Sequence, residues 1–269
     1  MSQADANTVT LPVAAKEGHT SMYLWHGSAM LIGPGIDSSP HAHFAVQLTL
    51  GLDKPFRARL GPDQPWIETR AAVFAPNQFH QIDCGGDMLA HLLVELPQRQ
   101  QTVSTVMPAQ YDALPHFAQV RAAFAAARQG RLDSDMAREA AQQWLHCAIP
   151  QAQSPTGFDP RIARALDWLA ANPGKEPDGA LLAAEVHLSE SRFTHLFRQQ
   201  TGMSLSRYLL WMRLLAGVAA VARGENMTNA AHQAGFADLA HMSRTFRSTF
   251  GVVPSELQKM TIAFKRNPA

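Results

Sequence analysis

The chain has 269 residues, of which 46% are hydrophobic and 17% are charged. This composition supplies enough apolar side chains for two domain cores and excludes a generally disordered chain. Two cysteines exclude a disulfide framework and favour a reducing compartment. The N-terminal sequence lacks the pattern of a signal peptide, and no apolar stretch reaches the length that spans a bilayer. We therefore expect a soluble, cytoplasmic protein without a membrane partner.

The net charge of +1 is distributed unevenly along the chain. Residues 1–158 contain 10 basic and 13 acidic residues, whereas residues 159–269 contain 13 basic and 9 acidic residues. A basic C-terminal half joined to an acidic N-terminal half indicates a nucleic-acid partner for the C-terminal half alone.

The first half of the chain has the pattern of a small β domain. We expect an N-terminal arm over residues 1–20, followed as far as Leu96 by short alternating or β-branched runs. Turns rich in glycine and proline separate these runs. Many short strands at this spacing are typical of a small barrel or sandwich, and we predict a small β-barrel.

Two amphipathic helices are predicted to follow the strands, over residues 114–128 and 133–149. Apolar residues recur in both at three- and four-residue steps, so each helix has an apolar stripe that needs a partner surface. The barrel wall and a second subunit are both candidates for that surface. A predicted linker over residues 151–158 then ends a first domain that comprises residues 21–150.

From Asp159 onward the sequence predicts helices only, and one part of this region occurs twice. The pairs Phe197-Arg198 and Phe246-Arg247 are equivalent, and each lies in a helix that follows a short alanine-rich helix and a tight turn. This is the helix-turn-helix pattern, and two copies joined by one long helix predict two DNA recognition helices. The helices are expected at residues 159–174, 179–186, 190–201, 205–223, 227–234 and 239–250.

The second copy resembles the sequence signature of the AraC/XylS transcription regulators. The matching residues are Ala231, Gly235, Phe236, Asp238, His241, Arg244, Phe246, Arg247, Gly251 and Pro254. Met242, Ala230 and Leu257 depart from the usual residues, by changes that leave DNA binding in place. The resemblance covers about residues 160–260 and implies an AraC-type domain over residues 159–269 that binds double-stranded promoter DNA.

The same resemblance implies which residues contact DNA. In the two recognition helices, the residues that would reach base edges are Ser191, Arg192, Thr194, His195, Leu239, Ala240, Ser243 and Arg244. Three further arginines, Arg198, Arg207 and Arg247, lie where phosphates are met, which sets affinity and register rather than sequence preference.

The N-terminal half resembles the cupin-like sensor domain of the same family, in PHAHFAVQLTLGL (residues 40–52) and AAVFAPNQFHQIDCG (residues 71–85). In metal-binding cupins such motifs supply two histidines and a glutamate from one strand and a histidine from another. The corresponding residues here are His41, His43, Gln47 and His80. The resemblance implies a two-domain α+β fold, with a cupin-like barrel and a dimerising helical pair before an all-α double helix-turn-helix domain.

Three functions for His41, His43, Gln47 and His80 are open from the sequence. They line the pocket of an organic effector, or they bind a divalent transition metal, or they are only surface and turn residues. Gln47 stands where a carboxylate would be wanted, and a neutral amide oxygen is a poor ligand for such ions. Three imidazoles still suit Zn, Ni, Cu or Fe.

The sequence therefore predicts a sequence-specific transcription regulator rather than an enzyme. We expect a homodimer through the N-terminal domain, in which a small molecule or metal modulates DNA binding, and a contact with RNA polymerase if the protein activates. One alternative is a cupin metalloenzyme, a dioxygenase or isomerase, with a helical appendage. Another is a regulator whose N-terminal domain only dimerises.

Overall fold

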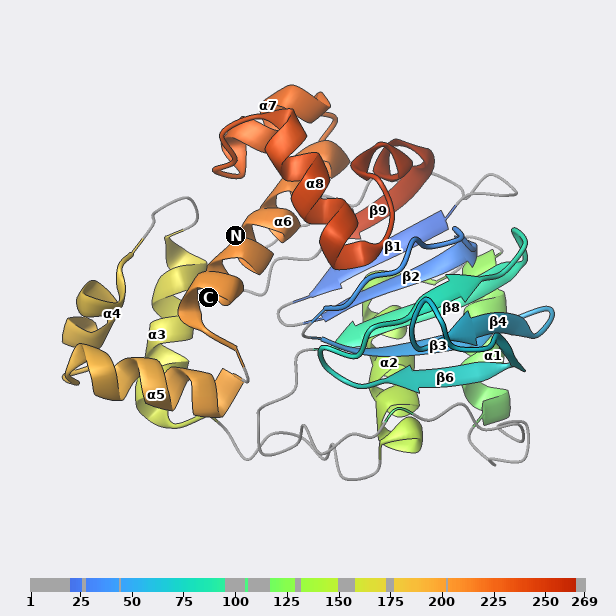
Figure 1. Cartoon of the computed structure of the whole chain (residues 1–269), viewed down its shortest axis with the longest axis horizontal. Helices are drawn as coiled ribbons and strands as arrows, with labels where there is room; N and C mark the ends of the chain where they lie inside the picture. Colours follow the sequence, from blue (N-terminus) through green and yellow to red (C-terminus); the bar gives the residue numbers. More distant parts are fainter. Residues whose placement is uncertain are drawn as a thin grey trace, which may run out of the picture.

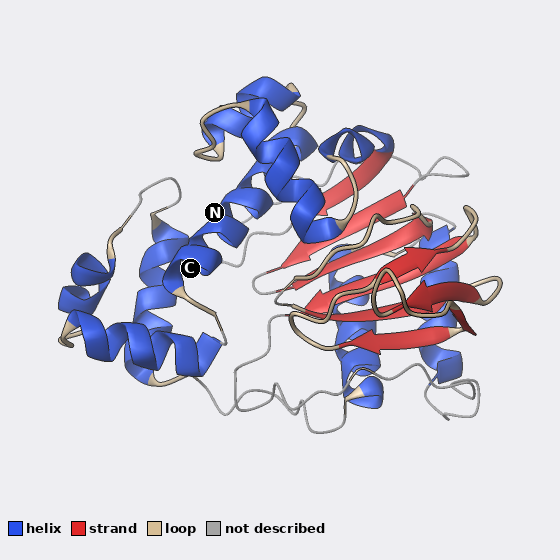
Figure 2. Cartoon of the chain, viewed as in Figure 1, coloured by secondary structure: helices blue, strands red, loops and turns tan. Residues whose placement is uncertain are grey.

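The computed structural model places a β-sheet domain beside a group of helices (Figures 1 and 2). The expected N-terminal arm, apart from Thr20, and the expected linker, apart from Phe158, lie outside the described residues. The structure describes residues 20–25, 28–43, 45–94, 105, 117–128, 132–149, 158–172, 177–201 and 203–264.

The strands form two sheets of different size. The larger sheet has the order β6-β3-β8-β2-β1-β9, and the smaller sheet has the order β5-β4-β7. The strands are β1 (Thr20–Trp25), β2 (Ser28–Pro34), β3 (Val46–Gly51), β4 (Phe56–Arg59), β5 (Ile67–Thr69), β6 (Ala71–Phe74), β7 (Gln81–Asp83), β8 (Met88–Val94) and β9 (Met260–Phe264).

The expected closed barrel is wrong, because the described strands leave the two sheets open. Closure needs a continuous hydrogen-bonded register around all strands. Instead, β6 is an edge of the larger sheet, and β5 and β7 are the edges of the smaller one. A single isolated bridge pairs His41 with His80, outside the named strands.

One face of the larger sheet packs against two helices that lie behind it in Figure 1. These helices are α1 (Phe117–Arg128) and α2 (Ser134–Ala148). Phe124 of α1 and Trp144 of α2 are buried and meet edge to face, with ring centroids 5.3 Å apart. The apolar stripes predicted for the helical pair are therefore covered, at least in part, by the sheet of the same chain.

The C-terminal helices enclose two helix-turn-helix units. They are α3 (Pro160–Ala171), α4 (Gly179–Glu185), α5 (Glu190–Thr201), α6 (Leu205–Ala222), α7 (Met227–Gln233) and α8 (Leu239–Phe250), and α4 to α8 end within one residue of their predicted bounds. In each turn one residue has positive φ, His187 at 55° and Gly235 at 79°. The next N–H, of Leu188 or Phe236, donates to the carbonyl five residues back and so terminates α4 or α7.

The two units have separate cores. In the first unit, Phe193 and Phe197 of α5 pack among the apolar residues of α3 and α4. In the second unit, Phe246 of α8 packs with Val218 of α6, in a cluster that also contains Met22, Leu24 and Ala29 of the larger sheet. Among the described residues, the second unit thus shares a core with the N-terminal sheet, and the first unit does not.

Helix α6 is apolar because it contributes to both units. Its 18 residues form the one helix in the described part of the chain that is long and apolar enough to cross a membrane, contrary to the expectation from sequence. Tyr208 is buried in the first unit and Leu214 in the second. Trp211 lies between them and packs with Ala45 and Leu93 of the sheet domain. These contacts are those of a core helix.

The strand β9 makes a further connection between the two halves. It follows a short 3-10 helix, Pro254–Lys259, and pairs in parallel with β1, from Thr20 opposite Met260 to Leu24 opposite Phe264. The prediction of helices only after Asp159 is wrong at this point. The run Met-Thr-Ile-Ala-Phe is short and contains β-formers, and its partner strand lies near the other end of the described chain.

We expect Phe197→Ala and Phe246→Ala to differ in how far their effects spread, although the residues occupy equivalent positions of the repeat. Each change removes a buried ring and should cost about 3–5 kcal/mol of stability. Phe197→Ala should accelerate amide exchange in α3 to α5 and at the start of α6 but not in β1 and β2, whereas Phe246→Ala should accelerate it in β1 and β2 as well as in its own unit. Hydrogen-exchange mass spectrometry measures this difference. Equal exchange of β1 and β2 in the two variants would contradict the shared core.

Candidate DNA-binding surface and effector site

The predicted DNA-contacting residues of the first unit lie on one exposed face of α5. The Ser189 hydroxyl oxygen accepts from the Arg192 N–H at 3.4 Å, which caps the start of the helix. Phe193 and Phe197 are fully buried on the opposite face. The exposed residues are Ser191, Arg192, Thr194, His195 and Arg198. This separation follows from the helical period and places Arg192 and Arg198 on the exposed face.

Helix α8 presents the corresponding face of the second unit. The Asp238 carboxylate accepts from the His241 N–H at 2.6 Å at its start, and Gly251 takes the left-handed conformation, φ 73°, at its end. Ala240, Arg244 and Arg247 are exposed, whereas Leu239 and Ser243 are partly buried. Met242, which replaces the usual aromatic residue, is buried. Leu239 and Ala240 have no hydrogen-bonding side chains and can contact only apolar groups of a base, such as a thymine methyl.

Arg207 is exposed near the start of α6, but it contacts the N-terminal domain. Its guanidinium donates to the Asn77 side-chain oxygen at 3.5 Å. Asn77 in turn donates its backbone N–H to the His43 carbonyl at 2.7 Å. The arginine that the sequence assigns to a phosphate is therefore held next to the predicted effector site.

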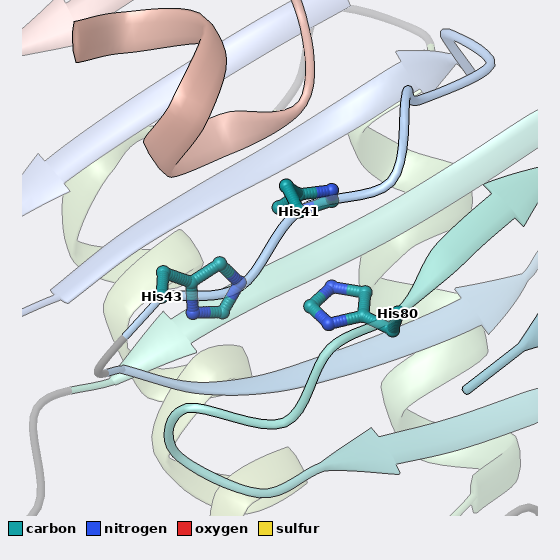
Figure 3. A group of neighbouring side chains, drawn as sticks. All are labelled: His41, His43 and His80. Carbon is teal, nitrogen blue, oxygen red and sulfur yellow. The ribbon is translucent and has the colours of Figure 1, made fainter. Parts of the chain in front are cut away.

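The three predicted histidines form a buried cluster (Figure 3). His41 and His43 come from the segment between β2 and β3, and His80 immediately precedes β7. Whereas metal-binding cupins supply the corresponding residues from one strand, His41 and His43 precede the strand that carries Gln47, because β3 begins at Val46. The rings still meet: one nitrogen of each histidine lies within 4.8 Å of those of the other two. Backbone hydrogen bonds of 3.1 and 2.9 Å pair His41 with His80.

Backbone carbonyls fix the tautomer of each histidine. The Nδ1 atoms of His41, His43 and His80 each lie 2.9 Å from a carbonyl oxygen. These carbonyls belong to Ser39, Ala45 and Gln78. Because a carbonyl can only accept, Nδ1 carries the proton, and Nε2 of each neutral ring keeps its lone pair.

Burial keeps these rings neutral. Burial, and then repulsion from His43, lowers the pKa of His41 to about 4. Burial, and then the other two rings, lowers the pKa of His80 to about 2. Burial also lowers the pKa of His43. At neutral pH the cluster therefore presents lone pairs rather than positive charges. The Nε2 of His80 has no hydrogen-bond partner among the described residues.

Polar residues of β3 and β8 extend the cluster. The side-chain amide of Gln47 lies 2.8 Å from the Nε2 of His43, and an Nε2 with a lone pair requires the NH₂ group of the amide to face it. Thr49 and Gln47 lie 3.0 and 3.4 Å from the Nδ1 of His91 on β8. His91 was not among the predicted site residues. Its one signal in the sequence is a polar residue within the apolar run of β8.

An apolar pocket lies between the larger sheet and the second helix-turn-helix unit. Leu24 and Leu31 line it from the sheet, and Val218, Phe246 and Phe250 line it from α6 and α8. Its polar lining residues include His41, Gln47 and His91. The structure thus brings all four predicted effector or metal residues together and places two of them on a pocket shared by both halves of the chain.

Comparison with known proteins agrees with the DNA-binding geometry. Residues 182–260 match a family model described as a helix-turn-helix domain. The chain is 32% identical over 117 residues to an HTH-type transcriptional activator RhaS of Pectobacterium carotovorum, and 39% identical over 83 residues to the transcriptional activator RhrA of Rhizobium meliloti. These matches cover 43% and 30% of this chain and 41% and 26% of the relatives, so the chain spans less than half the length of each relative.

The fold as a whole is similar to that of ToxT from Vibrio cholerae. A ToxT structure from strain O395 has a TM-score of 0.55 at 10% identity and covers 88% of this chain and 99% of its own. A structure of ToxT with a bound unsaturated fatty acid has a TM-score of 0.53 at 12% identity, and covers 89% and 96%. These structures share the fold, a β domain followed by a helix-turn-helix domain. The matched helix-turn-helix domain and the activator relatives agree with the resemblance of the C-terminal half to the AraC/XylS transcription regulators that the sequence predicted.

Proposed function

We propose that the protein is a sequence-specific transcription regulator that reads promoter DNA with α5 and α8 and responds to a ligand of its N-terminal domain. The observation that supports this most is the core in which Phe246 of α8 and Val218 of α6 pack with residues of the larger sheet, such as Leu24. The pocket at this contact is also lined by His41 of the histidine cluster. A ligand that binds there changes the free energy of docking between the sheet and the second unit. It thereby changes where α8 lies relative to α5.

The charge distribution supports DNA as the partner. Arg192 and Arg198 are exposed on α5, and Arg244 and Arg247 are exposed on α8. Arg192 and Arg244 lie in the first half of their helices, from where a guanidinium can bind a guanine in the major groove. The matched relatives are named activators. Activation, with a contact to RNA polymerase, is therefore the mode we propose.

The contact of Arg207 suggests one way to oppose DNA binding. Its guanidinium donates to Asn77 at 3.5 Å in this arrangement, whereas the helix-turn-helix pattern predicts that it meets a phosphate. The Arg207 nitrogen that donates to Asn77 must leave this partner before it can donate to a phosphate. We propose that the described arrangement is the form that opposes DNA binding. In this form the contact of Arg207 with Asn77 keeps the start of α6 next to the N-terminal domain.

The pocket supports an organic effector with an apolar body and a hydrogen-bonding head. Its apolar lining suits the body, and His41, Gln47 and His91 supply polar atoms for the head. The fatty acid bound to ToxT is a molecule of this general kind. The alternative input is a metal at His41, His43 and His80.

We also propose a homodimer through the N-terminal domain. Met136 of α2, which is 47% exposed, is an apolar side chain available for that contact.

We expect Arg244→Ala to weaken binding to a selected promoter fragment by about 5- to 150-fold, the equivalent of about 1–3 kcal/mol for a bidentate base contact. Arg247→Ala should weaken binding to all sequences alike and reduce its salt dependence, since it meets a phosphate. Fluorescence anisotropy at two salt concentrations measures both effects. Arg121→Ala, an exposed arginine of α1, is the control and should bind as the wild type does.

Unchanged affinity of Arg244→Ala would remove this residue from the set that reads bases. The proposed function itself fails if no genomic fragment is bound above random DNA at moderate salt, with or without candidate effectors.

We expect a thermal-denaturation screen to find apolar molecules with a hydrogen-bonding head that raise the melting temperature. A ligand at 100 times its Kd stabilises the folded state by about 2.7 kcal/mol. Leu31→Phe adds a ring to the pocket wall and should abolish the rise, because it occupies the ligand's volume. Leu181→Phe, at an exposed position of α4, is the matched control. A thorough screen without a stabilising molecule would favour an N-terminal domain that only dimerises.

A further inference from the structure

The histidine cluster has the chemistry of a metal site that is connected to a recognition helix. His41, His43 and His80 are at most 5% exposed, and one nitrogen of each lies within 4.8 Å of the others. We propose that these residues bind one divalent transition metal ion of the imidazole-preferring class, such as Zn²⁺, Ni²⁺ or Cu²⁺. We also propose that the bound ion shifts α8 through Ser39 and Gly251.

The hydrogen bonds at the Nδ1 atoms of the three rings match those that metal-ligating histidines typically make. A ligating histidine typically donates its second N–H to a carbonyl or carboxylate, which fixes the tautomer and orients the ring. Here all three Nδ1 atoms are already held by backbone carbonyls at 2.9 Å. Three Nε2 lone pairs remain. The Nε2 of His80 is a buried acceptor without a partner among the described residues, and a metal ion would satisfy it.

The three rings have to approach one another to complete the site, because their nitrogens lie up to 4.8 Å apart. In a tetrahedral zinc site the nitrogens are about 3.4 Å apart, from Zn–N distances of about 2.0–2.1 Å. The rings of His41 and His80 are already close, with centroids 4.3 Å apart, and their backbones are paired. The ring of His43 lies farther away, with centroids at 5.6 and 5.2 Å from the other two. We therefore expect His43 to move farthest and to release Gln47, and His41 to move by a smaller amount toward the ion.

Three histidines leave a fourth coordination position open, as in catalytic zinc sites. The three ligands are neutral, so the charge of the ion favours an anion, such as hydroxide or a carboxylate, in that position. His41 and Gln47 both line the apolar pocket. The fourth ligand can therefore come from a molecule in the pocket, which would let the metal and an organic effector bind together.

The connection to α8 is short. The N–H and the hydroxyl of Ser39 both donate to the carbonyl oxygen of Gly251, at 2.9 and 2.8 Å. Gly251 ends α8, and its own N–H donates to the Arg247 carbonyl at 2.8 Å. The contact leaves no free space, because a Cβ at position 251 would lie 2.5 Å from the Nδ1 of His41. A displacement of His41 therefore displaces the end of α8.

The binding part of this proposal is tested on metal-free full-length protein. Titration with Zn²⁺, Ni²⁺, Cu²⁺ or Co²⁺ should show one ion per chain and a rise in melting temperature of several degrees, and Co²⁺ should develop the visible absorption of a tetrahedral site. His80→Gln should lose these effects. His91→Gln changes a neighbouring, partly buried histidine, which lies outside the proposed ligand set, and should keep them. Absence of binding by all four ions, or equal affinity in His80→Gln and the wild type, would overturn the site.

A gain of affinity gives a second test that does not depend on removing a ligand. Gln47→Glu puts a carboxylate on β3 beside the cluster, at the position from which the Gln47 amide reaches His43 in the structure. Because carboxylates are good ligands for these ions and offset their charge, we expect Zn²⁺ affinity to rise at least tenfold. A folded Gln47→Glu protein with unchanged or weaker affinity would also overturn the site.

The coupling part rests on the proposed function, whereas metal binding does not. Zn²⁺ should alter amide exchange in α8 and leave α4 unchanged, and it should change affinity for the selected promoter fragment. Ser39→Ala keeps all three ligands but removes one of its two bonds to Gly251, so it should bind Zn²⁺ normally and show less than half of the change in promoter affinity. A bound ion that alters neither α8 exchange nor promoter affinity would overturn the coupling. Failure of the proposed function is separate, because it appears as a lack of specific DNA binding by every form.

Discussion

The docking of the second helix-turn-helix unit on the N-terminal sheet is the contact on which the rest of the structure depends. Strand β1 makes it possible, because Tyr23 and Trp25 face α1 and α2 while Met22 and Leu24 face the other way. That second face buries Phe246 of α8, and removal of this apolar surface from water stabilises the docked arrangement. The first unit has its own core and is linked to the second by α6. The position of one recognition helix is thus tied to the sheet, and the position of the other is not.

The polar cluster is the second consequence of this arrangement. Histidine and glutamine side chains in an apolar interior are unfavourable unless they are hydrogen-bonded. The bonds of Gln47 to His43 and of Thr49 to His91 offset much of that cost. A surface that served only docking would be more stable with apolar residues at these positions. A polar network that borders a pocket, at the contact between the two halves, is better explained by the binding of a ligand there.

The two halves differ in how much of them could be predicted from the sequence. The helix-turn-helix units carry local signals: the cap at Asp238, the turn at Gly235 and the repeated Phe-Arg pairs. The expected barrel was wrong, because closure depends on pairing between distant strand edges, for which the strand pattern carries no signal. The pairing of β9 with β1 was missed for the same reason. All four tentative site residues lie together, but His91 was hidden in an apolar strand. Gly251 matched the family signature, whereas its contact with His41 is visible only in three dimensions.

The central claim is that α5 and α8 together read one specific stretch of DNA. The most direct measurement is a nuclease footprint of the full-length protein on genomic fragments selected by binding. We predict a recurring sequence with protection over two successive major-groove segments on one face of the duplex, about 10 base pairs apart. Selection that enriches no common sequence, or protection confined to a single groove segment, would contradict it.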